Sequence, residues 1–490
     1  MALIESDYNY SSIMNCIYSK KRLFHVIFLI TISFFFVSTL SVSTTFLYPD
    51  FPWGDSAIFQ VIGRSWANGL LPYVDAWDLK GPYVFFVNFI GYSLNDSKYG
   101  IFIIQVLFMI WTTHLIYQFY HIKFGRLSSY SLMILTLIIL VPNYSAGNTV
   151  NEYCLPFLLG SFILLYQWAN NSGFNYPHLS GFIYGITWGI CLMSRLTNAL
   201  GLSFAILFVV VVLVLKREFP KLLSLICFFL LGLVLSVGPF MLYFAANEAI
   251  DELLYGTLLF NMEHVGSRIF HYGTGYYVVH FGFCFLCLCF FISEIFISKK
   301  RKNGVLWAMA SIPVFFWFSK SNGFTHYAII AIPYVCITIL EAKDIFSLYR
   351  FTSMGRYFLF LCLFVLVVSC SFNCKSLIDK QLIKNNTQIV EELYRDVCKS
   401  DKKASFIAYN VNPKLYLEYK ILPISPYFSL QDEHYSQSDT FKKRLHDNFA
   451  QLKAEWIMVR GENVAISDIL HANYSLYQQE GEYALYRLKQ

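Results

Sequence analysis

Long apolar runs alternate with short polar segments along most of the 490-residue chain. An α-helix of about twenty apolar residues spans the hydrocarbon core of a bilayer, which is about 30 Å thick. The pattern therefore predicts an all-α polytopic membrane protein with eleven transmembrane helices. The predicted spans are 23–47, 99–120, 127–143, 152–169, 179–194, 197–215, 221–245, 276–297, 304–319, 324–341 and 356–372.

The apolar stretch 82–94 is left out of this count. As a helix it covers only about 20 Å, which is too short to cross the bilayer. We expect an interfacial or re-entrant helix here. Counting it as a span would invert the predicted orientation of every later segment. It would then place the basic stretch "SKKRKN" outside, against the positive-inside rule.

Charged residues make up only 14% of the chain, against roughly 25% in soluble proteins. The net charge of +6 does not indicate a nucleic-acid partner, because the basic residues fall in short clusters between apolar runs. With eleven spans, most of these clusters lie on the side of the N terminus, which the positive-inside rule assigns to the cytoplasm. They are Lys20, Lys21 and Arg22; Lys123 and Arg126; Lys216, Arg217 and Lys221; Lys299, Lys300, Arg301 and Lys302; and Lys343, Arg350 and Arg356.

This threading divides the chain into three parts. Residues 1–22 form a cytoplasmic N terminus, and residues 23–372 form a transmembrane domain with outer loops 48–98 and 246–275. The second of these loops is amphipathic enough to lie on the membrane surface. Residues 373–490 form an outer domain on the far side of the membrane.

The outer domain alternates helical runs at 376–399 and 437–453 with the short apolar strands "ASFIAYN", "EWIMVRG" and "YALYRL". That alternation predicts a small α/β fold. Cys374 and Cys398 flank its first helical run, and the pattern leaves open whether they form a disulfide.

The first outer loop gathers charges that the rest of the chain uses sparingly, in "GDSAIFQVIGRSWANGLLPYVDAWDLKGPYVFF". Asp55 precedes a stretch with helical spacing, so it could be the N-cap of a helix, a catalytic carboxylate at the membrane surface, or both. Asp75 and Asp78 could lie one turn apart. Lys80 stands before the Gly-Pro that opens the interfacial helix, where an ammonium group suits a lipid-linked phosphate. Ordinary snorkelling of Lys80 to the interface is the alternative.

The pattern D-S-A-I-F-x(12)-P-Y-x-D-x-W-D-x-K-G-P resembles the first outer loop of the GT-C glycosyltransferases. More narrowly, it is similar to the bacterial branch related to protein O-mannosyltransferases and to aminoarabinose transferases that act on lipid A. "THYAIIAIP", with His326, is similar to a motif that opens a late span in relatives. "GITWGICLMSRLTN" is similar to their mid-chain glycine-rich helix and holds Arg195, and "GNTVNEYCLPF" holds Glu152 where relatives commonly have Asp. Relatives often have Pro in place of Gly81, so we expect a looser turn here that retains Lys80.

The resemblance implies a GT-C-like fold and an inverting, single-displacement glycosyl transfer at the outer face of a bacterial cytoplasmic membrane. The implied partners are a polyprenyl-phosphate-linked sugar donor, a glycan, lipid or protein acceptor, and membrane lipids. Asp55 would be the general base. No cofactor or metal site is required, although a divalent cation on the first-loop carboxylates is compatible with the residues. The donor phosphate would be held by Lys80, Arg195, Arg268 and His326, and Asp75, Asp78 and Glu152 would be acceptor-binding or accessory acidic groups.

Two other classes stay open. An O-antigen-type polysaccharide polymerase also uses lipid-linked glycans at the outer face, but its long outer loop usually comes late in the chain. A lipid-linked glycan flippase or transporter would show internal repeats or mid-membrane charges, and the sequence shows neither. His326 could instead be a structural residue at a helix end, and Arg195 could form a structural ion pair with Glu152.

Overall fold

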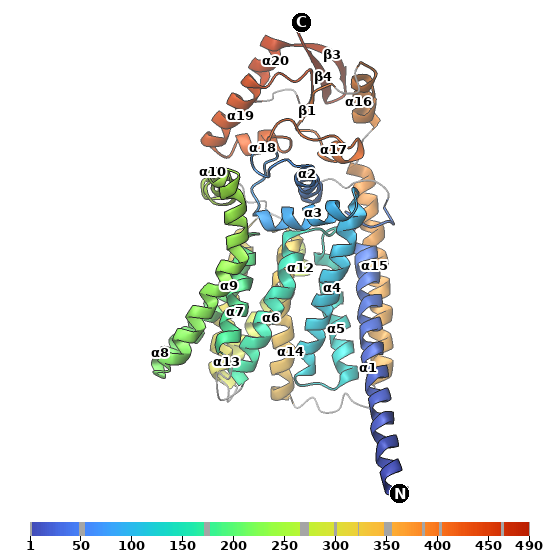
Figure 1. Cartoon of the computed structure of the whole chain (residues 1–490), viewed down its shortest axis with the longest axis vertical. Coiled ribbons are helices and arrows are strands. Elements are labelled where there is room, and N and C mark those ends of the chain that lie inside the picture. Colours follow the sequence, from blue (N-terminus) through green and yellow to red (C-terminus); the bar gives the residue numbers. More distant parts are fainter. Residues whose placement is uncertain are drawn as a thin grey trace.

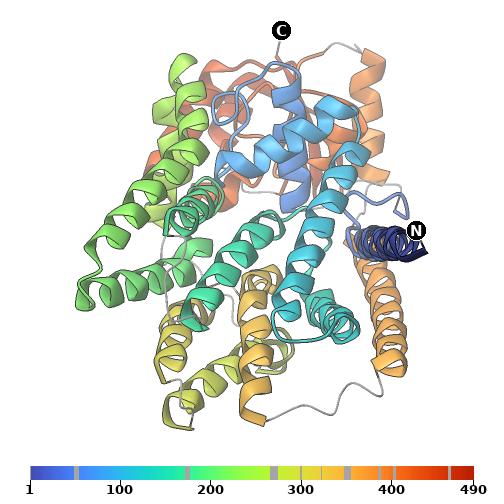
Figure 2. The ribbon, with the colours of Figure 1, turned by 60° about the horizontal axis from the view of Figure 1, so that its bottom comes forward.

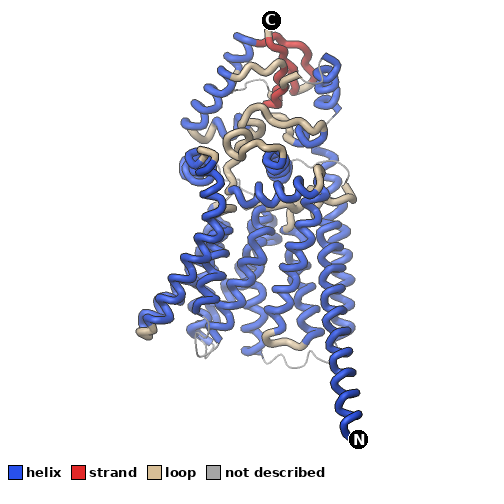
Figure 3. Tube along the Cα trace, viewed as in Figure 1, coloured by secondary structure: helices blue, strands red, loops and turns tan. Residues whose placement is uncertain are grey.

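The computed structural model describes residues 2–48, 54–170, 177–264, 274–297, 301–321, 323–346, 355–384, 388–400, 404–461 and 465–489. Within these residues, long helices form a bundle, and a smaller domain covers one end of it (Figure 1). The two chain termini lie at opposite ends of the molecule (Figure 1). Strands occur only in the C-terminal part of the described chain (Figure 3).

Every predicted span coincides with a helix of the bundle. Among the described residues, eight segments are both long and apolar enough to cross a membrane, namely those in α1, α4, α5, α8, α9, α12, α14 and α15. The helices α6, α7 and α13 stay predictions as spans, so the number eleven is not confirmed. The bundle helices are α1 (Ala2–Leu40), α4 (Lys98–His121), α5 (Arg126–Leu140), α6 (Val150–Asn170), α7 (Pro177–Leu192), α8 (Leu200–Leu215), α9 (Phe219–Ala246), α12 (Thr274–Ile297), α13 (Arg301–Lys320), α14 (Ile332–Phe346) and α15 (Gly355–Lys384).

Polar contacts join several of the basic segments at the N-terminal end of the bundle. The Arg126 guanidinium donates to the carbonyl of Lys21 at 2.5 Å. The Lys123 ammonium pairs with Asp344 at 2.7 Å, and Lys343 donates to the carbonyl of Lys123. The segments that the charge pattern assigns to one side of the membrane therefore meet in space. That this side is the cytoplasm stays a prediction.

Glycines let α7 and α9 pack with their backbones in contact. Gly181 and Gly185 of α7 are four residues apart and therefore lie on one face of the helix. A Cβ atom at Gly181 would lie 2.3 Å from the carbonyl oxygen of Leu225, and one at Gly185 would lie 2.0 Å from that of Phe229. This arrangement of small residues is typical of close helix pairs in membranes. This contact fixes the position of α7 along α9, and with it the position of Arg195, which follows the C-terminal end of α7.

The first outer loop forms two helices between the bundle and the C-terminal domain: α2 (Asp55–Ala67) and α3 (Pro82–Leu94). The helix α3 lies across the end of the bundle, while the long helices run roughly perpendicular to it (Figure 1). The prediction that residues 82–94 do not form a span is confirmed, because they form a short helix that does not run with the long ones. Its interfacial position stays a prediction.

The C-terminal domain holds a four-stranded sheet with strand order β1-β2-β4-β3. The strands are β1 (Phe406–Tyr409), β2 (Trp456–Arg460), β3 (Tyr474–Glu480) and β4 (Tyr483–Leu488). β1 and β2 are parallel, with Phe406 opposite Trp456, and β4 is antiparallel to both of its neighbours. The predicted strands correspond to β1, β2 and β4, so the expected α/β domain is confirmed.

Helices accompany this sheet: α16 (Gln388–Ser400), α17 (Lys414–Glu418), α18 (Gln431–Tyr435), α19 (Asp439–Gln451) and α20 (Ser467–Asn473). The predicted helical run 376–399 is shared by two helices, because α15 continues to Lys384 before α16 begins. Cys374 and Cys398 lie on these two helices as free thiols. The disulfide that the sequence left open is therefore not formed in this structure.

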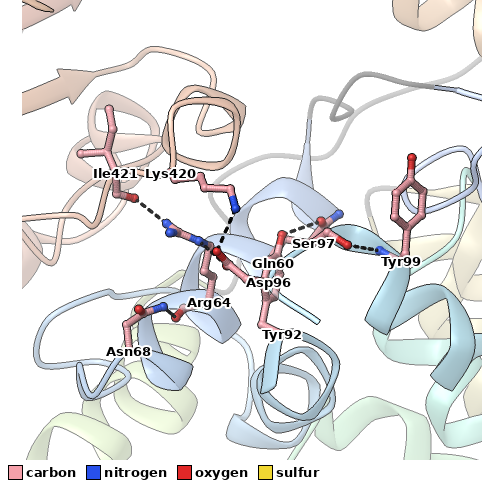
Figure 4. Close-up of polar contacts among 9 residues, drawn as sticks. All are labelled: Gln60, Arg64, Asn68, Tyr92, Asp96, Ser97, Tyr99, Lys420 and Ile421. Carbon is pink, nitrogen blue, oxygen red and sulfur yellow. Dashed lines mark hydrogen bonds and ion pairs between the residues drawn. The ribbon is translucent and has the colours of Figure 1, made fainter. Parts of the chain in front are cut away.

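An ion-pair network joins the first loop to the C-terminal domain (Figure 4). Arg64 on α2 is buried and donates through Nε to Asp96 at 2.9 Å and through Nη1 to the carbonyl of Ile421 at 3.2 Å. Lys420 reaches the second oxygen of Asp96 at 3.1 Å. Burial alone would raise the pKa of Asp96, but the hydrogen bonds from Lys420 and Arg64 lower it. Arg64 therefore links the first outer loop to the C-terminal domain.

The described part of the second outer loop contains α10 (Ile250–Leu254), the π-helical turn η3 (Tyr255–Leu259) and α11 (Phe260–His264). Glu252 pairs with Arg444 of the C-terminal domain at 2.6 Å, and Asn261 donates to the carbonyl of Leu79 at 2.9 Å. The loop thus contacts both the first loop and the C-terminal domain, while Met262 is 66% exposed on another face. Its predicted position on the membrane surface stays a prediction.

Replacing Gly185 by Val tests the α7–α9 contact. The new Cβ would overlap the Phe229 carbonyl. We therefore expect the free energy of unfolding to fall by about 2 kcal/mol or more, and the thermal unfolding midpoint in detergent to be clearly lower. Gly160→Val is the matched control, since a Cβ at Gly160 of α6 has nothing within 4 Å. Equal midpoints for the two variants would contradict the close packing.

Candidate active site

The segment that leads from α2 to α3 is held in shape by its own polar groups. Tyr73, which has a positive φ of 69°, donates through its hydroxyl to the carbonyl of Lys80 at 2.7 Å. The carboxylate of Asp78 accepts from the amide of Lys80 at 2.9 Å. The carboxylate of Asp75 accepts from the amide of Leu71 at 2.6 Å. Asp75 therefore stabilises the turn that begins at Leu71, and Asp78 orients the backbone of Lys80.

The end of this segment is docked on the residues that follow α7. The amide of Gly81 donates to the carbonyl of Ser194 at 3.0 Å, and the amide of Tyr83 donates to that of Met193 at 2.9 Å. A Cβ atom at Gly81 would lie only 2.2 Å from the Met193 carbonyl oxygen. The expectation of a looser turn at Gly81 is wrong: the missing side chain permits a closer contact. Proline would lack the N–H that makes the first hydrogen bond.

This docking brings Lys80 near Arg195, which begins the 3₁₀ segment η2 (Leu196–Ala199) as its N-cap. The guanidinium of Arg195 lies 4.1 Å from the ring centre of Tyr327 and 5.4 Å from that of Trp317. Its Nη2 also donates to the hydroxyl of Tyr327 at 2.6 Å. Arg195 is therefore held by aromatic groups, while its side chain stays partly exposed.

His326 belongs to η4 (Thr325–Ala331), the 3₁₀ segment that precedes α14. Its ring is stacked on Phe324, with centroids 5.7 Å apart and planes 9° apart, and meets the ring of Tyr327 edge-on at 4.8 Å. His326 and Arg195 thus share Tyr327 as a neighbour. Both lie within electrostatic reach of Asp55, and His326 also lies within electrostatic reach of Lys80.

Asp55 is the first residue of α2, and Gly54 is the N-cap, which makes no side-chain capping bond. The interpretation of Asp55 as an N-cap is therefore wrong. Its side chain is exposed, yet protein atoms surround it closely. Desolvation would raise the pKa of this carboxyl, but Lys80, His326 and Arg195, in that order, favour the charged form and lower the pKa below its ordinary value. Asp55 is thus a carboxylate at neutral pH.

Asp78 lies near the same charges but in a drier position. Its side chain is 3% exposed, and this burial raises its pKa. The positive charge of Lys80 opposes the shift, whereas the negative charge of Asp55 adds to it. The two carboxyl groups therefore differ: Asp55 is open and readily ionised, and Asp78 is enclosed and harder to ionise.

Two other predicted residues are not part of this cluster. Glu152 is buried in α6 and accepts a hydrogen bond from Gln105 at 2.6 Å, so the suggested ion pair with Arg195 is not formed. Gln105 in turn accepts from Ser41 at 3.0 Å and from Thr44. Glu152 therefore belongs to a polar network inside the bundle. Arg268 lies outside the described residues.

The sequence interpretation missed one titratable neighbour, His434 on α18, whose charge also acts on Asp55. His434 meets the Trp77 ring edge-on at 5.3 Å, and the amide of Trp77 donates to the carbonyl of Pro426 at 3.0 Å. The C-terminal domain thus reaches the loop that carries Lys80. Nothing in the local sequence around His434 indicated this proximity. Tyr327, by contrast, could have been found, because it follows His326 in the quoted motif.

The described residues contain no group of three His, Cys, Asp or Glu side chains arranged to hold a metal ion. Asp75 in particular is engaged with the Leu71 amide. The cluster instead presents one exposed carboxylate beside two or more cationic side chains. Such a set can accept a proton from a neutral hydroxyl and can bind an anionic group such as a phosphate.

Residues 79–243 match the family model described as dolichyl-phosphate-mannose-protein mannosyltransferase. That range contains Lys80 and Arg195, while Asp55 precedes it. No curated protein sequence matches the chain significantly.

Two solved structures of ArnT from Cupriavidus metallidurans are similar in fold along almost the whole chain. The apo structure has a TM-score of 0.59 and 11% identity, and the alignment covers 96% of this chain and 98% of ArnT. The structure of ArnT bound to undecaprenyl phosphate has a TM-score of 0.55 and 10% identity, with 94% and 97% covered. The family model and this ArnT-like fold confirm the resemblance to the GT-C glycosyltransferases that the sequence motifs indicate.

The variant Gly81→Ala tests the junction that brings Lys80 to Arg195. A methyl group there overlaps the Met193 carbonyl, so we expect the two segments to separate. The free energy of unfolding should fall by about 1–3 kcal/mol, and the thermal unfolding midpoint should fall with it. Gly125→Ala is the control, because its φ of −66° suits alanine and a Cβ would meet nothing within 4 Å. A Gly81→Ala protein as stable as the control would show that the contact is not tight.

Proposed function

We propose that this chain is a membrane glycosyltransferase of the GT-C type that moves a sugar from a polyprenyl-phosphate donor to a hydroxyl group of a glycan, lipid or protein acceptor. The observation that carries the proposal is the cluster of Asp55 with Lys80, Arg195 and His326 at the end of the bundle covered by the C-terminal domain. The family model over residues 79–243 and the ArnT-like fold support it.

In the proposed reaction Asp55 takes the proton of the acceptor hydroxyl. The acceptor oxygen forms a bond to the anomeric carbon of the sugar while the bond from that carbon to the phosphate oxygen breaks, which inverts the anomeric configuration. The electron pair and the negative charge leave with the polyprenyl phosphate. A positioned base of this kind contributes about 10²–10⁴-fold to the rate.

Lys80 and Arg195 would stabilise the departing phosphate, and His326 would donate a hydrogen bond to it. Fixed cations that face a developing charge stabilise the transition state more than the ground state, because they need no reorganisation during the reaction. The aromatic contacts of Arg195 and the docked backbone next to Lys80 supply this fixed geometry. Arg268 remains a candidate for the same role from the sequence alone.

The low pKa of Asp55 gives the donor a second role. Without the donor, the nearby cations hold Asp55 in its charged form and make it a weak base. A bound phosphate would offset part of their positive charge, and the pKa of Asp55 would rise toward the range of a useful base. Donor binding would thereby activate the acceptor-side chemistry. Asp78, which orients the Lys80 amide, would support this arrangement, and Asp75 would shape the turn.

The site would face outward from a bacterial cytoplasmic membrane, because the basic segments lie at the opposite end of the bundle. Glu152 is the least suited of the predicted acidic residues to touch the acceptor, since it is buried and bonded to Gln105. We propose that it maintains the polar network beneath the site.

The variant Asp55→Asn tests the base directly. At equal expression we expect the cells' surface glycan to lose one sugar and the corresponding polyprenyl-phosphate sugar to accumulate, with turnover in membranes reduced at least 100-fold. Mass spectrometry of both pools makes the measurement. Asp251→Asn, which changes an exposed carboxylate on α10, is the control and should resemble the wild type.

Full turnover by a correctly inserted Asp55→Asn protein would remove Asp55 from the mechanism. Accumulation of complete but unpolymerised repeat units would identify a polysaccharide polymerase instead of the proposed transferase.

The pH dependence of the rate tests the link between Lys80 and Asp55. The base must be ionised, so kcat/KM should fall as the pH drops through the Asp55 pKa, which in the free enzyme lies below the ordinary aspartate value. Lys80→Gln removes the positive charge that lowers the Asp55 pKa most, so the acidic limb should move to higher pH. Lys420→Gln is the control, because Lys420 pairs with Asp96, and it should leave the acidic limb unchanged. An unchanged acidic limb in Lys80→Gln would contradict the proposed effect of Lys80 on Asp55.

A further inference from the structure

An open pocket of about 390 Å³ lies far from the candidate active site, at the N-terminal end of the bundle. It is formed by α1, α5 and α15, which lie side by side (Figures 1 and 2). Its walls are the apolar and aromatic side chains of Phe24, Phe28, Leu127, Tyr130 and Leu359. These helices are predicted to cross the membrane with this end toward the cytoplasm, which would place the pocket against lipid at the depth of the inner headgroups.

Two cations, Lys21 and Arg126, complete the lining of this apolar pocket. The Arg126 guanidinium lies 5.7 Å from the ring centre of Phe24 and 5.9 Å from that of Tyr130, and it donates to the carbonyl of Lys21 at 2.5 Å. Among the described residues, no Asp or Glu forms an ion pair with either cation. An arginine has five N–H donors, so most of them remain for another acceptor.

The wall beside these cations is held firmly. The hydroxyl of Tyr130 is 2.8 Å from Nδ1 of His25, and Nε2 of His25 is 3.2 Å from Nδ1 of His114. Tyr130 itself is only 2% exposed. The aromatic surface on which Arg126 rests is therefore fixed by a chain of hydrogen bonds that joins α1, α4 and α5.

We propose that this pocket binds an anionic phospholipid of the inner leaflet. Its phosphate would lie on Lys21 and Arg126, and one acyl chain would occupy the pocket. The charge complementarity selects an anionic headgroup, because the planar guanidinium of Arg126 and the ammonium group of Lys21 match phosphate oxygens. The apolar walls select a lipid over a soluble phosphate. This site is separate from the proposed transferase site and does not depend on it.

The experiment uses the full-length protein purified in detergent. Phosphatidylglycerol and phosphatidylcholine with identical acyl chains are added in turn, bound lipids are counted by native mass spectrometry, and thermal unfolding is followed in parallel. Inorganic phosphate alone is a third addition. The variants are Lys21→Gln with Arg126→Gln, which removes the charge, and Leu359→Trp, which fills the pocket and keeps the charge.

We expect the wild type to retain phosphatidylglycerol and to be stabilised by it, with little effect of phosphatidylcholine or phosphate. The charge variant and Leu359→Trp should each lose retention by about tenfold. Lys216→Gln with Arg217→Gln is the matched control, because it removes two exposed cations from the turn between α8 and α9, outside the pocket lining.

Equal retention of the two lipids by the wild type would overturn the proposal. So would an equal loss in the control variant, which would indicate a general charge effect, or an equal stabilisation by inorganic phosphate, which would indicate a site for the free ion. If the charge variant does not fold, unchanged retention by Leu359→Trp would still contradict an acyl chain in the pocket.

Discussion

The backbone junction between Gly81 and Tyr83 on one side and Ser194 and Met193 on the other is the contact on which the site depends. It joins two segments that are more than a hundred residues apart in the sequence. Because one ends at Lys80 and the other at Arg195, two cations meet without an ion pair to pull them together. Backbone hydrogen bonds and the close approach of Gly81 hold them there. Side-chain repulsion between the cations is offset by Asp55, which faces both.

Trp77 shows how the second outer loop and the C-terminal domain support this junction. Its ring centre lies 4.9 Å from that of Phe260 in the second loop and 5.1 Å from that of Phe441 in the C-terminal domain. Its backbone amide donates a hydrogen bond to the carbonyl of Pro426. Three separate segments therefore meet on a residue that lies three positions before Lys80. Their packing helps to remove water from the surroundings of Asp78, and charges interact more strongly in such an environment. The C-terminal domain thus acts on the electrostatics of the site as well as covering it.

The two ends of the bundle show the same chemistry in two settings. At the covered end, cations held by aromatic rings and backbone contacts surround a carboxylate. At the other end, Lys21 and Arg126 stand over an apolar pocket. Guanidinium groups placed on aromatic surfaces keep a fixed position while leaving N–H donors for phosphate oxygens. At the covered end, the described residues also place the carboxylate of Asp55 beside these cations.

The bundle helices, the short helix at 82–94 and the strands β1, β2 and β4 could all be predicted from the sequence. These follow from run length, periodicity and charge placement, which are local properties of the chain. Four other features became visible in the three-dimensional structure alone. Gly81 tightens its junction, and Gly54 rather than Asp55 is the N-cap of α2. Glu152 bonds to Gln105, and His434 lies near the site. Those outcomes depend on which backbones can approach each other and on which groups lose their water. Neither is encoded in the spacing of residues along one segment.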